Sequence, residues 1–153
     1  MLINCIPCER ISQIQQGSNP YFVVELKTGY VVLGDHQFYK GYTIFHCKEH
    51  KRELHELDPE FRFLYLKEMS VVAEAVFTAF HPVKLNYALL GNADEHLHWH
   101  IFPRYDDDPL PKQPVWQLDK SIRTAESTCP SIEELDTLKQ ILLLEIFKII
   151  GSI

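Results

Sequence analysis

The stretch HLHWHIF, residues 96–102, constrains the fold of this chain more than any other segment. Histidines alternate with apolar residues, and successive side chains of a β-strand point to opposite faces. The three histidines, His96, His98 and His100, therefore share one face of the expected strand, and the apolar residues share the other. The pattern predicts a strand in a sheet with one face in the core and one face free for chemistry.

Four other segments have the composition of neighbouring strands. Residues 21–35 contain two runs rich in Val, Tyr and Phe around a Thr28-Gly29 turn, which indicates a hairpin. A third run, residues 42–47, follows the break at Gly41. A fourth, residues 85–90, is joined to the histidine stretch by the turn sequence GNADE. Because these connections are short, we expect an antiparallel sheet of about five strands.

Two helices are indicated by their capping residues. Asp58 can cap a helix that begins at Pro59, and apolar residues then recur at helical spacing until His81-Pro82. Ser131 and Glu134 match a capping box that opens a last helix, which we expect to run to about residue 150. These elements predict an α+β fold, one antiparallel sheet with helices on one face, in a single domain over residues 1–153.

Two terminal segments flank the expected sheet. Residues 1–20 hold a CxxC motif followed by a polar connector, and residues 104–153 hold an extra loop and the last helix. Four prolines and a run of aspartates between residues 103 and 114 predict a surface loop. We interpret Arg104, at its start, as half of an exposed salt bridge.

The charge balance excludes one class of partner. A net charge of −6 argues against binding to long nucleic acid, which relies on a basic face, whereas a small phosphorylated ligand needs only one locally favourable site. The first residues lack the basic and apolar regions of a secretory signal. The most apolar stretch, residues 141–150, is shorter than the roughly 20 residues that span a bilayer. We therefore expect a cytoplasmic protein without a membrane partner.

The histidine face can serve two kinds of chemistry. Neutral imidazoles can bind Zn²⁺. Alternatively, one imidazole can attack phosphorus while its neighbours donate hydrogen bonds to the anion, leaving a phosphoramidate on the enzyme. Strand geometry places the neighbouring histidines about 6 to 7 Å on either side of His98. His98 is therefore the first candidate for the nucleophile.

The four cysteines suggest a second site. Cys5 and Cys8 form the CxxC motif, which indicates a metal site, a redox pair or chance spacing. Cys47 and Cys129 have no partner at ligand spacing, so we interpret them as buried thiols. His46 is a further candidate metal ligand.

Residues 96–102 fit the pattern His-φ-His-φ-His-φ-φ, where φ is apolar, and in this the chain resembles the histidine triad (HIT) family. The resemblance extends over about residues 5–105, including LGD at 33–35 and KGYTIFHCKEH at 40–50. It implies a five-stranded antiparallel sheet with a long helix, a homodimer, and a nucleotide hydrolase or transferase. The chain resembles the bacterial dinucleoside polyphosphate hydrolase-like branch of the family.

The resemblance also implies roles for single residues. His98 corresponds to the nucleophile, and His100 to a residue that donates hydrogen bonds to phosphate or leaving-group oxygens. Asn92 corresponds to an asparagine that contacts the phosphate side. Asp35 corresponds to an acidic residue that holds the ribose hydroxyls, a role that suits a carboxylate.

A structural zinc site is implied as well. Its ligands would be Cys5, Cys8, His50 and His96, a closed Cys₂His₂ set that takes His96 away from the phosphate. The chain departs from the family at Ala93-Asp94-Glu95, where Gly-Gln or a serine often helps to bind phosphate. Two carboxylates there would repel an anion unless they point away or hold a metal.

The sequence thus predicts a hydrolase of a phosphoanhydride or phosphoramidate, with a dinucleoside polyphosphate as the expected substrate class and a covalent nucleotidyl-His98 intermediate. Mg²⁺ would accompany a polyphosphate substrate. Three alternatives remain open. They are a nucleotidyl transferase that uses the same intermediate, an enzyme whose three histidines hold a catalytic zinc, and a nucleotide sensor without activity.

Overall fold

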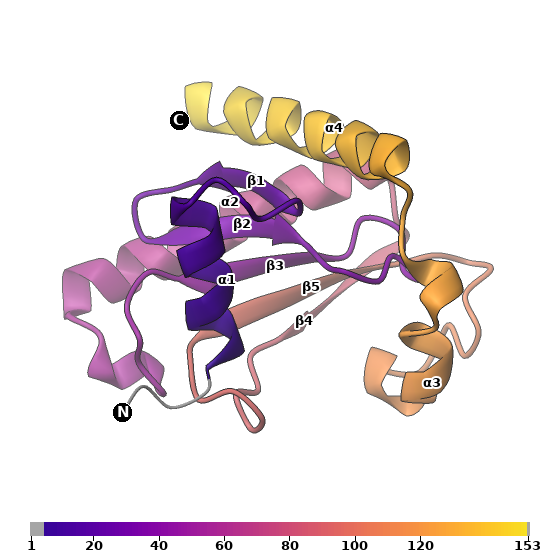
Figure 1. The fold of residues 1–153 in the computed structure, drawn as a ribbon, viewed down its shortest axis with the longest axis horizontal. Helices are drawn as coiled ribbons and strands as arrows, with labels where there is room; N and C mark the ends of the chain where they lie inside the picture. The colour runs from indigo at the N-terminus through magenta and orange to yellow at the C-terminus, as the bar shows by residue number, and fades with distance from the viewer. Residues whose placement is uncertain (1–4, 153) are drawn as a thin grey trace.

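The computed structural model describes residues 5–152 and contains one antiparallel sheet in the strand order β1-β2-β3-β5-β4 (Figure 1). The strands are β1 (Phe22–Glu25), β2 (Gly29–Leu33), β3 (Thr43–Cys47), β4 (Lys84–Ala88) and β5 (His98–Arg104). β1 and β2 form the expected hairpin, in which the Leu26 amide donates to the Gly29 carbonyl (2.8 Å). The predicted fold class, an α+β fold around a five-stranded antiparallel sheet, is confirmed.

The strand register separates the sheet into two chemically different faces. Phe45 of β3 lies opposite Trp99 of β5, and these side chains belong to the core face. On the other face His46 lies opposite His98, and Ile44 opposite His100. The alternation in the histidine stretch therefore has the predicted result over β5, because His98 and His100 share the face away from the core.

Helix α2 (Pro59–Phe80) covers the core face of the sheet. Asp58 caps it by accepting from the amides of Glu60 (3.0 Å) and Phe61 (3.3 Å), as predicted. Its Tyr65 is fully buried, and the ring stacks on Phe45 with 5.1 Å between centroids. The helix thus holds the central strands in place from behind.

Helix α4 (Ile132–Gly151) packs against α2 and β1 at the edge of the fold (Figure 1). Its capping box forms as predicted, since Glu134 Oε2 accepts from the Ser131 amide (2.8 Å) and Ser131 Oγ from the Glu134 amide (3.2 Å). One stripe of the helix is buried, and it consists of Leu135, Leu138, Leu142 and Ile146. None of the described helices is both long and apolar enough to cross a membrane.

The prediction of a polar connector after the CxxC motif is wrong, because residues Ile6–Gln15 form helix α1. This helix also corrects the expectation that all helices lie on one face. α1 lies in front of the strands and α2 behind them (Figure 1). Only Pro7 and Ile11 of α1 are buried, so the hydrophobic spacing that reveals a helix in sequence is too sparse here.

The predicted bounds of the histidine strand, 96–102, are shifted by two residues. His96 precedes β5, whereas Pro103 and Arg104, assigned to the loop, belong to the strand. Proline fits at this position because the pairing of β5 with β3 ends at Ile101, so one side of Pro103 needs no partner. The residues from 105 to 114 form no helix or strand, in line with the predicted loop.

Residues 105–130 return to the sheet face that carries His98 and His100. They include helix α3 (Lys120–Arg123) and two single 3₁₀ turns (Val115–Gln117 and Glu126–Thr128); a further 3₁₀ turn (Leu54–Glu56) precedes α2. Val115 and Leu118 form a second hydrophobic cluster with Tyr39 and Phe102. The extra segment therefore has a small core of its own beside the histidines.

Candidate functional site

The structure divides the three histidines between two places. His98 and His100 project from β5 with their ring centroids 4.8 Å apart. His96 lies in the preceding loop, is 1% exposed, and points its ring toward Cys5 and Cys8. The structure thus places His96 beside the CxxC cysteines and apart from His98 and His100.

One hydrogen bond determines which nitrogen of His98 can react. His98 Nδ1 lies 2.5 Å from the carbonyl oxygen of His96. A carbonyl oxygen only accepts, so the proton of the neutral ring is on Nδ1, and Nε2 carries the free electron pair. His98 therefore has the tautomer that a nucleophilic imidazole needs.

His100 is oriented by a tyrosine. The Tyr42 hydroxyl lies 2.6 Å from His100 Nδ1. Burial, with a smaller effect from His98, lowers the pKa of His100 to about 3, and burial raises the pKa of Tyr42, so both groups are neutral near pH 7. When the hydroxyl donates to Nδ1, the imidazole proton lies on Nε2 and is free to donate to an anion.

The position of Tyr42 follows from packing. Its ring stacks on Phe102 with 4.0 Å between centroids, and Gly34 leaves room for it, since a Cβ there would lie 2.1 Å from the ring. Sequence reasoning missed Tyr42. Its position just before β3 offered a signal, because a residue two before Ile44 lies on the same face of an extended chain.

The four residues predicted as zinc ligands come together in one cluster. Their ligand atoms all lie within 4.8 Å of one another. Cys8 Sγ lies 3.2 Å from His50 Nδ1 and 3.3 Å from His96 Nδ1, and Cys5 Sγ lies 3.6 Å from both nitrogens. A tetrahedral zinc with normal bond lengths would separate sulfur and nitrogen ligands by about 3.6 Å. The cluster therefore fits a metal ion of this type.

The backbone around the cluster supports its ligands. The second ring nitrogen of His96, Nε2, lies 2.8 Å from the Cys47 carbonyl, so it donates there and leaves Nδ1 free for a metal. The two acidic residues that depart from the family pattern point elsewhere. Asp94 accepts from the Ile6 amide at the start of α1 (3.2 Å), and Glu95 pairs with Arg52 (2.9 Å). Neither needs to face a phosphate.

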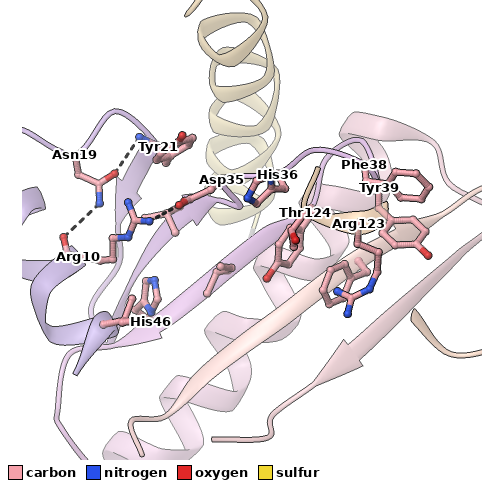
Figure 2. A pocket seen from close by; sticks show the side chains of 15 residues that line it. Arg10, Asn19, Tyr21, Asp35, His36, Phe38, Tyr39, His46, Arg123 and Thr124 are labelled. Atoms are coloured by element: carbon pink, nitrogen blue, oxygen red, sulfur yellow. Dashed lines mark hydrogen bonds and ion pairs between the residues drawn. The ribbon is translucent and has the colours of Figure 1, made fainter. Parts of the chain in front are cut away.

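A cavity of about 240 Å³ opens on the sheet face that carries His98 and His100, and its wall includes His46, the neighbour of His98 on β3 (Figure 2). Apolar and aromatic side chains form part of its wall, and they are Ile6, Val32, Phe38, Tyr39, Tyr42, Ile44 and Phe102. Three charged side chains also line it. Arg10 of α1 and Asp35, which follows β2, form an ion pair at one side, and Arg123 of α3 lies at the other. Such a cavity suits a flat organic ring with polar groups attached.

A match to a family model identifies the family. A sequence model described as the HIT domain matches residues 16–107, which is more than half of the chain. The chain belongs to the histidine triad family. A comparison with curated protein sequences gives no match.

Solved structures of other HIT proteins share the fold. A histidine triad protein from Marinobacter aquaeolei VT8 is 26% identical, with a TM-score of 0.68 over 84% of this chain and 89% of that one. A Zn-bound histidine triad family protein from Mycobacterium smegmatis is 22% identical, with a TM-score of 0.67 over 98% of both chains. The diadenosine triphosphate hydrolase of Plasmodium falciparum is 16% identical, with a TM-score of 0.57 over 84% of this chain and 78% of that one.

Some predicted site residues of this HIT protein lie elsewhere. Asn92 is exposed in the turn before β5, and no described contact joins it to the histidines or the cavity. His46 is outside the metal cluster and lies in the cavity wall, 5.9 Å from the His98 ring. Cys129, expected to be buried, is exposed beside His36, with 3.5 Å between Sγ and Nδ1, because the loop that carries it lies on the surface.

Arg104 also differs from its interpretation as half of an exposed salt bridge. Its side chain is 4% exposed, and that of its partner Asp108 is 8% exposed. The guanidinium further donates to Asn86 Oδ1 (2.8 Å) and to the Gln113 carbonyl (2.7 Å). Buried charges need such complete pairing, and here it ties the HIT-domain sheet to the loop that follows it.

Proposed function

We propose that this HIT protein is a nucleotide hydrolase that cleaves a phosphoanhydride or phosphoramidate through a covalent nucleotidyl-His98 intermediate. The observation that carries the proposal is the hydrogen bond from His98 Nδ1 to the His96 carbonyl, which leaves the Nε2 electron pair free. Family membership supports a nucleotide-directed reaction. A distant neighbour in fold is a diadenosine triphosphate hydrolase, which makes dinucleoside polyphosphates the first substrates to test.

In the first step, the Nε2 electron pair of His98 attacks the α-phosphorus and forms a P–N bond. The bond from phosphorus to the leaving oxygen or nitrogen breaks, and its electron pair leaves with that atom; a leaving nitrogen takes up a proton from water and departs as a neutral amine. His100 Nε2–H donates to a phosphoryl or leaving-group oxygen. In the second step, water attacks the phosphorus and loses a proton to solvent, the P–N electron pair returns to His98 Nε2, and a nucleoside monophosphate is released.

The cavity would hold the nucleoside during both steps. Its apolar wall, with Ile44 and Phe102 on the sheet, offers a surface for the base. Asp35 would accept from the ribose hydroxyls. A carboxylate has about four lone-pair positions, so Asp35 can bind a diol while it is paired with Arg10.

We also propose that Cys5, Cys8, His50 and His96 hold a structural zinc ion. The closed Cys₂His₂ set and the ligand spacing support this assignment, and a family member of the same fold is Zn-bound. The described residues form no metal cluster that includes His98 or His100, which speaks against a catalytic zinc on three histidines.

The proposal is tested by trapping the intermediate. Wild-type protein is mixed with diadenosine tetraphosphate and with adenosine 5′-phosphoramidate, quenched, and analysed by intact mass. We expect an acid-labile adduct of one nucleoside monophosphate on His98. His98→Asn should form no adduct and lose hydrolysis, whereas His55→Asn, at an exposed histidine, should keep both.

An active His98→Asn protein would refute the mechanism. Added phosphate that appears in the product would favour the transferase, because phosphate then replaces water as the acceptor. Nucleotide binding without turnover would favour the sensor. The homodimer, the single domain, the cytoplasmic location, the role of Asn92 and the use of Mg²⁺ stay predictions.

A further inference from the structure

We propose that Arg123 binds a phosphate group of the substrate other than the one attacked by His98, so that the site selects nucleotides with an anionic leaving group. This inference rests on the proposed function and narrows its substrate class to polyphosphates. Arg123 lies outside the region matched by the HIT-domain model, which ends at residue 107. Family membership by itself therefore assigns Arg123 no role.

The first observation is that residues 105–130 are built into the site and do not merely pass over it. Arg104 fixes the beginning of the segment through Asp108, Gln113 and Asn86, as described above. The end of the segment is fixed by a backbone hydrogen bond from the Gln37 amide to the Thr128 carbonyl (2.8 Å). Between these points, Arg123 and Thr124 line the cavity (Figure 2).

The second observation is that the segment connects the triad to Arg123. Trp116 stands perpendicular to His100, with 5.7 Å between ring centroids, and to Phe102, with 5.4 Å. The Arg123 guanidinium lies 5.0 Å from the centroid of the same indole ring. His98, His100, Trp116 and Arg123 are thus successive neighbours. A phosphorus bound to His98 lies at one end of this series and the guanidinium at the other.

The third observation concerns charge. Of the three charged side chains in the cavity wall, Arg10 and Asp35 neutralise each other, which leaves Arg123 as the remaining positive charge. Its Nε donates to the Leu118 carbonyl (3.1 Å), and among residues 5–152 no hydrogen bond or ion pair uses its two terminal NH₂ groups, although the guanidinium packs on the Trp116 ring. In a chain of net charge −6, an available guanidinium inside a ligand cavity favours an anion there.

These observations place two different phosphates at the two ends of the series that runs from His98 to Arg123. The attacked phosphate must reach His98 Nε2, so the anion at Arg123 is a further phosphate of the same ligand. A phosphoramidate whose leaving group is a neutral amine has no such phosphate. A nucleoside diphosphate, nucleoside triphosphate or dinucleoside polyphosphate has one.

Ligand binding tests this assignment without relying on turnover. Dissociation constants of AMP, ADP and ATP, and of the guanine series, are measured by calorimetry without Mg²⁺, in a His98→Asn background that prevents consumption. Arg123→Gln should weaken ADP and ATP binding by about 10- to 100-fold, the usual effect of losing a charge-assisted hydrogen bond, and AMP binding by less than about twofold. Arg123→Lys keeps the positive charge but loses the bidentate guanidinium, so its affinities for ADP and ATP should lie between those of Arg123 and Arg123→Gln.

Lys120→Gln is the matched control, since it removes a positive charge from the exposed side of the same short helix, and it should leave all three affinities unchanged. Equal weakening of AMP, ADP and ATP by Arg123→Gln would overturn the inference, because a packing role on Trp116 predicts that result. Unchanged affinities, or no nucleotide binding at all, would overturn it too. The adduct on wild-type His98 decides the proposed function separately.

Discussion

The buried imidazole of His46 should make the protein less stable in mild acid. His46 is 4% exposed, faces His98, and its Nδ1 has no partner among the described residues. Burial lowers the pKa of His46 to about 3, and positive charge on His98, His96, His100 and Arg10 lowers it further in the same direction. The folded protein therefore keeps this ring neutral over a range in which the unfolded chain protonates it.

The sign and the size follow from proton linkage. A histidine in the unfolded chain has a pKa of about 6.5, so below that pH the unfolded state binds the extra proton and gains free energy. At pH 5.5 this gain is RT ln 11, about 1.4 kcal/mol, and at pH 7.5 it is below about 0.1 kcal/mol. The stability due to a neutral His46 is complete well above pH 6.5 and is lost progressively as the pH falls through 6.5 toward 3.

Urea unfolding at pH 7.5, 6.5 and 5.5, followed by tryptophan fluorescence at constant ionic strength and zinc concentration, measures this effect. The free energy of unfolding of wild-type protein should fall by about 1.4 kcal/mol more than that of His46→Gln between pH 7.5 and 5.5. Other histidines contribute to both proteins, so the difference isolates His46. His55→Gln is the control, because water solvates an exposed imidazole in both states.

Parallel pH profiles for wild-type protein and His46→Gln would refute this reasoning, since they would mean that the folded protein protonates His46 as easily as the unfolded chain does. A wild-type protein that gains stability relative to the variant in acid would refute it more strongly. That result would require a hydrogen-bond acceptor for the charged ring.

Three further predictions concern the supports of the site. Tyr42→Phe should lower the free energy of unfolding by about 1 to 2 kcal/mol and slow hydrolysis, because His100 loses its partner; unchanged values in urea titrations and rate assays would contradict this. Gly34→Ala should lower the free energy of unfolding by about 1 to 3 kcal/mol in the same titrations, because the added Cβ would collide with the Tyr42 ring. In a Tyr42→Ala background the decrease should be clearly smaller, and equal decreases in the two backgrounds would contradict the contact. Cys8→Ser should lose zinc in elemental analysis and unfold at lower temperature, whereas Cys129→Ser, outside the cluster, should keep its zinc; zinc retained by Cys8→Ser would contradict the ligand set.

The sequence was most informative where short-range patterns determine structure. The alternation around His98, the capping residue Asp58 and the capping box at Ser131 each depend on neighbours within a few residues, and all three appear in the structure. The sequence spacing of the four proposed metal ligands, by contrast, does not define a site by itself. His50 and His96 were assigned through resemblance to a family, and the structure then places them beside Cys5 and Cys8.

The missed features depend on partners far away in the chain. Helix α1 buries little apolar surface, and it is fixed by Asp94 at its first amide and by the ion pair of Arg10 with Asp35. Arg104 looks like a surface residue in sequence because its partners come from a loop without secondary structure. No periodicity within one segment reports such contacts, because they exist only after the sheet and the loops have come together.

The two sites are mechanically connected through the backbone between His96 and His98. The His96 ring is held from both sides, by the cysteine sulfurs at Nδ1 and by the Cys47 carbonyl at Nε2. Its own carbonyl accepts the His98 proton, so the group that fixes the tautomer of the proposed nucleophile belongs to a residue of the metal cluster. A rotation of the His96 peptide would weaken that hydrogen bond and allow the other tautomer, in which Nε2 carries the proton and cannot attack. A metal ion held by this cluster would therefore support the proposed reaction by keeping one carbonyl in place.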